Sequence, residues 1–201
     1  MNRYTRSMTE PSGTRYGTGK DALLQAVVAV VSERGLRGLT YRSVAERAGV
    51  NNTLVAHHFG TRDALIAAAL DWASQRSISA SKLREAVVAG RSFTESLLEL
   101  LLQDPDLQVF QYEMILESRR RPELVNGVLN LYENYVCALA EGLTASGVEG
   151  DTRVLGRILF AALDGLVLQY LAGVDRQVIS ASLEEIHQVL LRQAQTNTPT
   201  A

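Results

Sequence analysis

Three consecutive polar residues, Asn51, Asn52 and Thr53, stand where an apolar helical pattern begins. An amide side chain can pair with adenine through two hydrogen bonds, and a threonine can bond a base edge or pack its methyl group on thymine. The start of a helix also favours a phosphate, because its unpaired N–H groups point outward. These residue types in this order are therefore suited to reading DNA bases from the tip of a helix.

The elements around this tip have the spacing of a helix-turn-helix. The segment Tyr41 to Phe59, YRSVAERAGVNNTLVAHHF, predicts a helix over about 41–48, a turn at Gly49 and a second short helix over about 52–58. Thr40 is placed to cap the first helix, and the second would lie in the major groove of DNA. Apolar contacts between the two helices are expected from Val44, Ala45, Ala48, Val50 and Val55.

The rest of the chain also has helical spacing. Residues 1–17 combine Pro, Gly, Ser and arginines without periodicity and are interpreted as a flexible arm. A first helix is predicted over about 20–34, and further helical patterns cover 93–102, 107–116, 124–143, 155–170 and 178–190. The expected fold is all-α with about nine helices. A three-helix DNA-binding domain would span 18–62, and a helical effector and dimerisation domain would span 63–201.

Charge is distributed unevenly along the chain. The 201 residues are 46% hydrophobic and 21% charged, which is typical of a globular protein, and the net charge is −2. Residues 1–62 hold nine Lys/Arg against four Asp/Glu, whereas the remainder holds eleven against eighteen. The net positive charge of the N-terminal third is what we expect of a module that faces phosphates.

No targeting segment is evident in the sequence. The N-terminus has no apolar block before Ala22, and the most apolar stretch, 155–172, is interrupted by Arg157 and Asp164. A secretory signal and a membrane span would both need an uninterrupted apolar run. We therefore expect a cytoplasmic protein that does not span a membrane.

Enzyme and metal chemistry find little support. The chain has no Gly-rich phosphate loop, HExxH or EF-hand pattern. The neighbouring His57 and His58 would point about 100° apart on a helix and have no evident third ligand. Cys137 is the single cysteine, so an intramolecular disulfide is excluded. The sequence predicts no enzyme activity, no cofactor and no metal.

The middle helical patterns carry aromatic, thioether and hydroxyl side chains that either line a ligand cavity or form an ordinary core. Glu113, Glu117 and Asp164 would serve as polar anchors for a cationic or hydroxyl-bearing ligand. A salt bridge to Arg157 is the alternative explanation for Asp164, because a buried carboxylate is costly unless paired. The candidate effector pocket comprises Phe93, Phe110, Tyr112, Glu113, Met114, Glu117, Tyr135 and Asp164.

Over residues 20–66 the sequence resembles the TetR family of bacterial transcription regulators. The resemblance is carried by a first helix ending in Gly35, a Thr before Tyr41, VAERAGV at 44–50 and HHFGTRDAL at 57–65. Farther along, QYEMILESRRRPEL at 111–124 is similar to the C-terminal domain of the BetI-type branch.

The resemblance implies roles for several side chains. Arg42 would contact a base or a phosphate, His57 the DNA backbone, and Arg62 a phosphate. The family usually has a tyrosine in the recognition helix where this chain has Ala56, so that phosphate contact is either missing or moved to His57 or Tyr41. The predicted DNA-contact set is Arg42, Asn51, Asn52, Thr53, His57 and Arg62.

The last two helices are expected to form a homodimer. The predicted helix at 151–172 is apolar on nearly every face, and its partner at 175–193 carries an apolar stripe of Ile179, Leu183, Ile186 and Leu190. In the TetR-like architecture these helices pair with their two-fold mates, which suits the reading of two DNA half-sites. The alternative is that both helices are internal core.

Taken together, the sequence predicts a sequence-specific DNA-binding transcriptional regulator, most simply a repressor released from its operator by a small-molecule effector. Its expected partners are double-stranded operator DNA, a second copy of the chain and the effector. The alternative is a helical protein-interaction module that has kept a vestigial helix-turn-helix. Charge reversal at Arg42 and Arg62 would separate the two, because only the first would lose DNA binding.

Overall fold

The computed structural model describes residues 18–80 and 104–196. Within these ranges the chain forms eight α-helices and two short 3-10 helices and has no strand, which confirms the all-α prediction. The predicted arm over 1–17 and the helical pattern over 93–102 lie outside the described residues.

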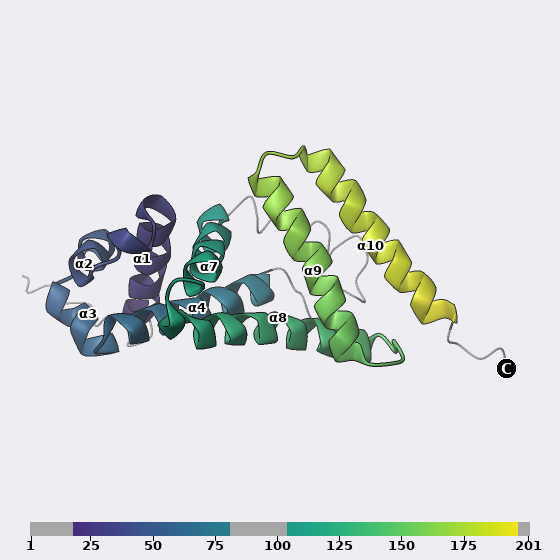
Figure 1. The fold of residues 1–201 in the computed structure, drawn as a ribbon, viewed down its shortest axis with the longest axis horizontal. Helices are drawn as coiled ribbons and strands as arrows, with labels where there is room; N and C mark the ends of the chain where they lie inside the picture. The colour runs from purple at the N-terminus through teal and green to yellow at the C-terminus, as the bar shows by residue number, and fades with distance from the viewer. Residues whose placement is uncertain (1–17, 81–103, 197–201) are drawn as a thin grey trace, which may run out of the picture.

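The N-terminal helices form the predicted helix-turn-helix. Helix α1 (Thr18–Arg34) is followed by η1 (Leu36–Gly38), α2 (Tyr41–Ala48) and α3 (Asn52–Phe59), as Figure 1 shows. The start of α2 is a capping box, in which the Thr40 hydroxyl accepts the Ser43 N–H at 3.0 Å and the Ser43 hydroxyl accepts the Thr40 N–H at 2.9 Å. Gly49 ends α2 in the left-handed conformation, which makes the turn.

Helix α4 (Arg62–Ala80) leaves the helix-turn-helix and runs beside α8 (Val125–Ala145). Thr61 caps α4, since its hydroxyl accepts the Ala64 N–H at 3.1 Å. Helix α7 (Pro105–Ser118) packs against α1 and α4, and η2 (Pro122–Leu124) joins it to α8. One apolar core therefore continues from the N-terminal helices into the C-terminal part of the chain.

The C-terminal pair is α9 (Thr152–Leu171) and α10 (Arg176–Thr196). Helix α9 lies across α8, and its Gly156 stands where an added Cβ would come within 3.0 Å of the Val136 carbonyl oxygen. Figure 1 shows α10 running alongside α9 at the end of the molecule away from α2 and α3. Among the described helices, α9 alone has the length and apolar composition of a membrane span, with 28% of that window buried.

Candidate nucleic-acid interface

The recognition helix α3 has one buried and one exposed face. Val55 and Phe59 are buried in the core, whereas Asn52, Thr53 and His57 are exposed. The predicted tip is therefore at the surface.

Asn51 has a specific local role at this tip. Its side-chain oxygen accepts the Thr53 N–H at 2.9 Å and caps α3. Because that oxygen is engaged by the helix itself, Asn52 is the better placed of the two amides for a base edge.

One predicted packing contact of the motif is wrong. Val44, Ala45 and Val55 are buried as expected, but Val50 is 36% exposed, as is Leu54. The Val50 N–H donates to the Ala45 carbonyl at 3.0 Å and so closes the turn after α2, which leaves the Val50 side chain at the surface. The tip of α3 thus presents two apolar side chains beside its polar ones.

Arg42 and Tyr41 stand at the start of α2. The Arg42 side chain is 84% exposed and pairs with Glu46, one helical turn later, at 2.8 Å. The hydrogen bond that Arg42 donates to the Glu46 carboxylate raises the pKa of the Arg42 guanidinium. The Tyr41 hydroxyl donates to the Gly60 carbonyl at 2.8 Å, which ties α2 to the turn that follows α3.

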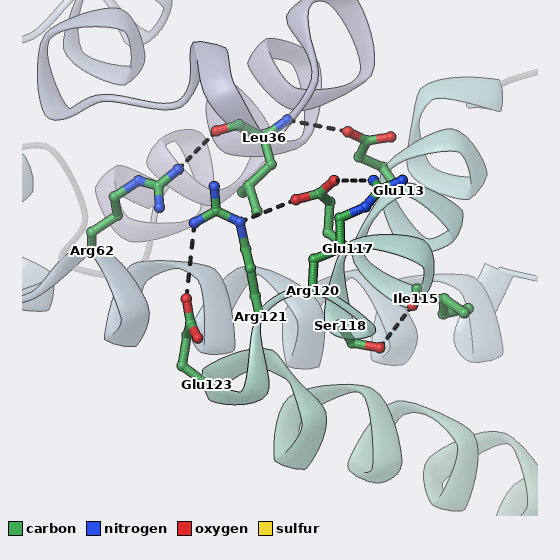
Figure 2. A network of polar contacts seen from close by, with 9 residues as sticks. All are labelled: Leu36, Arg62, Glu113, Ile115, Glu117, Ser118, Arg120, Arg121 and Glu123. Carbon is green, nitrogen blue, oxygen red and sulfur yellow. Dashed lines mark hydrogen bonds and ion pairs between the residues drawn. The ribbon is translucent and has the colours of Figure 1, made fainter.

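Arg62 is half-buried and bonded within the protein. Its Nη2 donates to the Leu36 carbonyl at 2.7 Å and its Nε to the Leu39 carbonyl at 3.1 Å. The first residue of α4 therefore holds the η1 turn, a role that the sequence did not indicate (Figure 2).

Glu113 and Glu117 lie on the face of α7 that is directed at η1 and η2 (Figure 2). Glu113 Oε1 accepts the Leu36 N–H at 3.3 Å. Glu117 accepts hydrogen bonds from Arg121 and Arg120, each at 3.0 Å, and the bond from Arg121 is the main cause that lowers its pKa. These hydrogen bonds do not bring the two glutamates together with Asp164, since Glu113 bonds to η1 and Glu117 bonds to arginines near the end of α7.

Asp164 lies instead in an aromatic cluster at the other side of α7. Its Oδ1 accepts the Tyr112 hydroxyl at 2.6 Å, while the Tyr135 ring stacks on Phe160 with centroids 4.7 Å apart. Burial raises the pKa of Asp164, and the Tyr112 hydrogen bond partly opposes this. The alternative explanation for Asp164, a salt bridge to Arg157, is wrong.

The reason is that Arg157 is directed toward α8. It pairs there with Glu133, as does Arg153, and these two arginines lower the pKa of the Glu133 carboxyl. Asp164 is left with a tyrosine as its hydrogen-bond partner and with no cation among the described residues.

The remaining pocket candidates divide further. Phe110 and Met114 are fully buried in the common core, and Phe93 lies outside the described residues. Tyr135 donates to Gln111 Oε1 at 2.8 Å, within a buried polar group that also contains Gln108 and Ser77. Burial raises the pKa of Tyr135 to about 12. Gln108 and Gln111 were missed in the sequence, although two amides three residues apart in an apolar pattern are a signal for such a group.

The surface of α9 and α10 carries an apolar groove of about 700 Å³. Its wall includes Ile158, which is 62% exposed, and Val189, which is 44% exposed. Leu155, Leu159, Leu166, Ile186 and Leu190 also line it. An exposed apolar surface of this kind is typical of an interaction site.

Comparisons with known proteins agree with this geometry. Residues 23–69 match the family described as "Bacterial regulatory proteins, tetR family", and residues 88–193 match "Tetracyclin repressor-like, C-terminal domain". The HTH-type transcriptional regulator BetI of Serratia proteamaculans is 26% identical over 163 residues, which is 75% of this chain and 79% of the relative.

Solved structures share the fold. A crystal structure assigned to the TetR family from Rhodococcus sp. superposes with a TM-score of 0.74 at 23% identity, over 87% of this chain and 98% of that one. The multidrug binding protein EbrR, complexed with proflavin, has a TM-score of 0.58 at 27% identity, over 87% of this chain and 99% of its own.

The capped recognition helix, its exposed polar tip and these matches define a helix-turn-helix transcriptional regulator that binds DNA. The matched C-terminal domain alone spans more than half of the chain. This protein belongs to the TetR family of bacterial regulators.

Proposed function

We propose that this chain is a homodimeric repressor that binds operator DNA through α3 and leaves it when a small molecule binds the C-terminal domain. The observation that carries the proposal is the exposed polar tip of α3 on a helix-turn-helix fixed by side-chain caps at Thr40 and Asn51. Such a protein acts where the genomic DNA is, which in a bacterium is the cytoplasm.

At the DNA, Asn52 and Thr53 read base edges, and His57 contacts the backbone in place of the tyrosine that Ala56 replaces. His57 is favoured over Tyr41 because the Tyr41 hydroxyl is already donated to Gly60. Arg42 is exposed and would exchange its Glu46 partner for a phosphate. Asn51 contributes as the helix cap.

The dimer forms through the apolar groove of α9 and α10. Val154, Ile158 and Val178 are each more than half exposed on these two helices, which is unfavourable unless a partner covers them. A second copy related by two-fold symmetry covers both grooves at once and presents two recognition helices to two half-sites.

The effector site is proposed beside Tyr112, Tyr135 and Asp164. Asp164 is a half-buried carboxylate without a cationic partner among the described residues. Tyr112 donates a hydrogen bond to it, and burial, helped by the Asp164 charge, raises the pKa of Tyr132 and Tyr135 nearby. A carboxylate with tyrosines nearby suits an organic cation. The complex of EbrR with proflavin supports a small-molecule effector in a protein of this fold.

The test begins with a pool of random DNA duplexes, from which the purified protein selects the sequence that it binds. Asn52→Ala is expected to weaken binding to the selected duplex by roughly 5- to 150-fold, which is the discrimination given by one bidentate base contact. The affinity for scrambled DNA is expected to stay unchanged. Asn130→Ala removes an equally exposed amide from α8 and serves as the matched control. If no duplex is enriched by the wild-type protein, the interaction-module alternative takes the place of this proposal.

A further inference from the structure

The backbone of Leu36 is held from both sides. Its carbonyl accepts from Arg62 at 2.7 Å, and its N–H donates to Glu113 at 3.3 Å (Figure 2). Arg62 belongs to the helix that follows the recognition helix, whereas Glu113 belongs to α7. A single residue of η1 therefore bonds both to α4, which follows the recognition helix, and to α7.

The turn and the glutamate approach each other closely. An added Cβ on Gly35 would lie 3.1 Å from Glu113 Oε1, so the absence of a side chain there gives the carboxylate access to the backbone. The Leu36 side chain is 1% exposed, which anchors the turn in the core while its N–H and C=O face the two partners. Since η1 leads directly into the Thr40 cap of α2, the position of this turn sets where α2 begins.

Tyr112, which precedes Glu113 on α7, has its partner on a different side of the helix. Tyr112 donates to Asp164 on α9, while Glu113 accepts from η1. Consecutive side chains on a helix point about 100° apart, so one turn of α7 contacts both the proposed effector cluster and the DNA-binding helices.

We propose that Glu113 is a positioning residue for operator binding: by accepting the Leu36 N–H, it holds η1 and α2 in the arrangement that fits DNA. The inference rests on the proposed function, because it assigns to the C-terminal domain a direct part in DNA affinity. Glu113 touches no DNA and acts through the backbone of Leu36, which Arg62 also holds.

The direction of the effect separates positioning from charge. Glu113 is an anion on the side of the molecule that carries the DNA-binding helices, so a purely electrostatic role would make its removal strengthen DNA binding. If Glu113 positions η1, Glu113→Ala should instead weaken DNA binding, because alanine offers no acceptor for the Leu36 N–H. Glu113→Gln lacks the charge but keeps a side-chain oxygen at the same reach, so it rescues binding.

The experiment measures the affinity of full-length protein for the selected duplex and for scrambled DNA. For Glu113→Ala we expect a loss of about 3- to 10-fold on the selected duplex, the effect of one hydrogen bond, and no loss on scrambled DNA. Glu113→Gln is expected to bind within about 2-fold of the wild type. Asp106→Ala removes an exposed carboxylate from the same helix and serves as the charge control.

Hydrogen exchange of the Leu36 amide, measured without DNA, gives the second readout. It is expected to be faster in Glu113→Ala than in the wild type and restored in Glu113→Gln. Unchanged operator affinity in Glu113→Ala, or tighter binding in both Glu113 variants, would overturn the inference. Failure of the proposed function would show earlier and separately, as a wild-type protein that does not distinguish the selected duplex from scrambled DNA.

Discussion

Substitution of Ile158 tests the proposed dimer through α9 and α10. Complete burial of an isoleucine side chain stabilises by about 1.5–3 kcal/mol, and Ile158 is still 62% exposed in the single chain. Covering the exposed part would contribute about 1–2 kcal/mol in each protomer, and the two-fold axis doubles this to about 2–4 kcal/mol per dimer. Ile158→Asp loses that contribution and also places a carboxylate in an apolar groove.

The dimer dissociation constant of Ile158→Asp is therefore expected to rise by at least about 30-fold. Sedimentation velocity over a dilution series measures it directly. Leu129→Asp is the matched control, because Leu129 is 57% exposed but lies on α8, outside the groove. The reasoning would be refuted if Ile158→Asp dimerised like the wild type, or if Leu129→Asp dissociated as readily as Ile158→Asp.

Two further predictions concern α9. Gly156→Ala would place a Cβ 3.0 Å from the Val136 oxygen, whereas Gly165→Ala in the same helix meets nothing within 4 Å. Urea unfolding should show Gly156→Ala less stable by about 1–2 kcal/mol and Gly165→Ala more stable by about 0.5–1 kcal/mol; equal effects would contradict the close packing of α8 and α9. The Asp164 pKa is raised by burial in the folded state, so the free energy of unfolding should fall as pH rises through that pKa. Asp164→Asn should flatten this fall in a pH series of unfolding curves, and an unchanged slope would show that Asp164 does not titrate in this way.

Local sequence signals located the DNA-binding helices well. The cap at Thr40 and the turn at Gly49 depend on side-chain and backbone preferences that act over three or four residues, and both are present. Val44 and Val55 are buried, as the local apolar pattern predicted. The prediction that Val50 packs between the two helices was wrong, because the direction of its side chain depends on how the backbone closes the turn. The pattern of apolar residues carries no information about that closure.

Side chains with partners far along the chain were not predictable in this way. Arg62 bonds to a turn 26 residues earlier, and Glu113 bonds to a turn 77 residues earlier. The sequence identified both as polar residues of interest, but periodicity does not reveal which neighbouring helix each one faces. Asp164 and Arg157 share an apolar helix, and only the packing of α8 decides that Arg157 pairs with Glu133.

The most direct test of the account is the affinity of the wild-type protein for its selected duplex and for scrambled DNA over a salt series, measured by fluorescence anisotropy. We expect a preference of about a thousandfold or more for the selected duplex, with affinity that falls steeply as salt rises because phosphate contacts release counterions. Equal affinity for the two duplexes at every salt concentration would contradict the claim that this chain is a sequence-specific regulator.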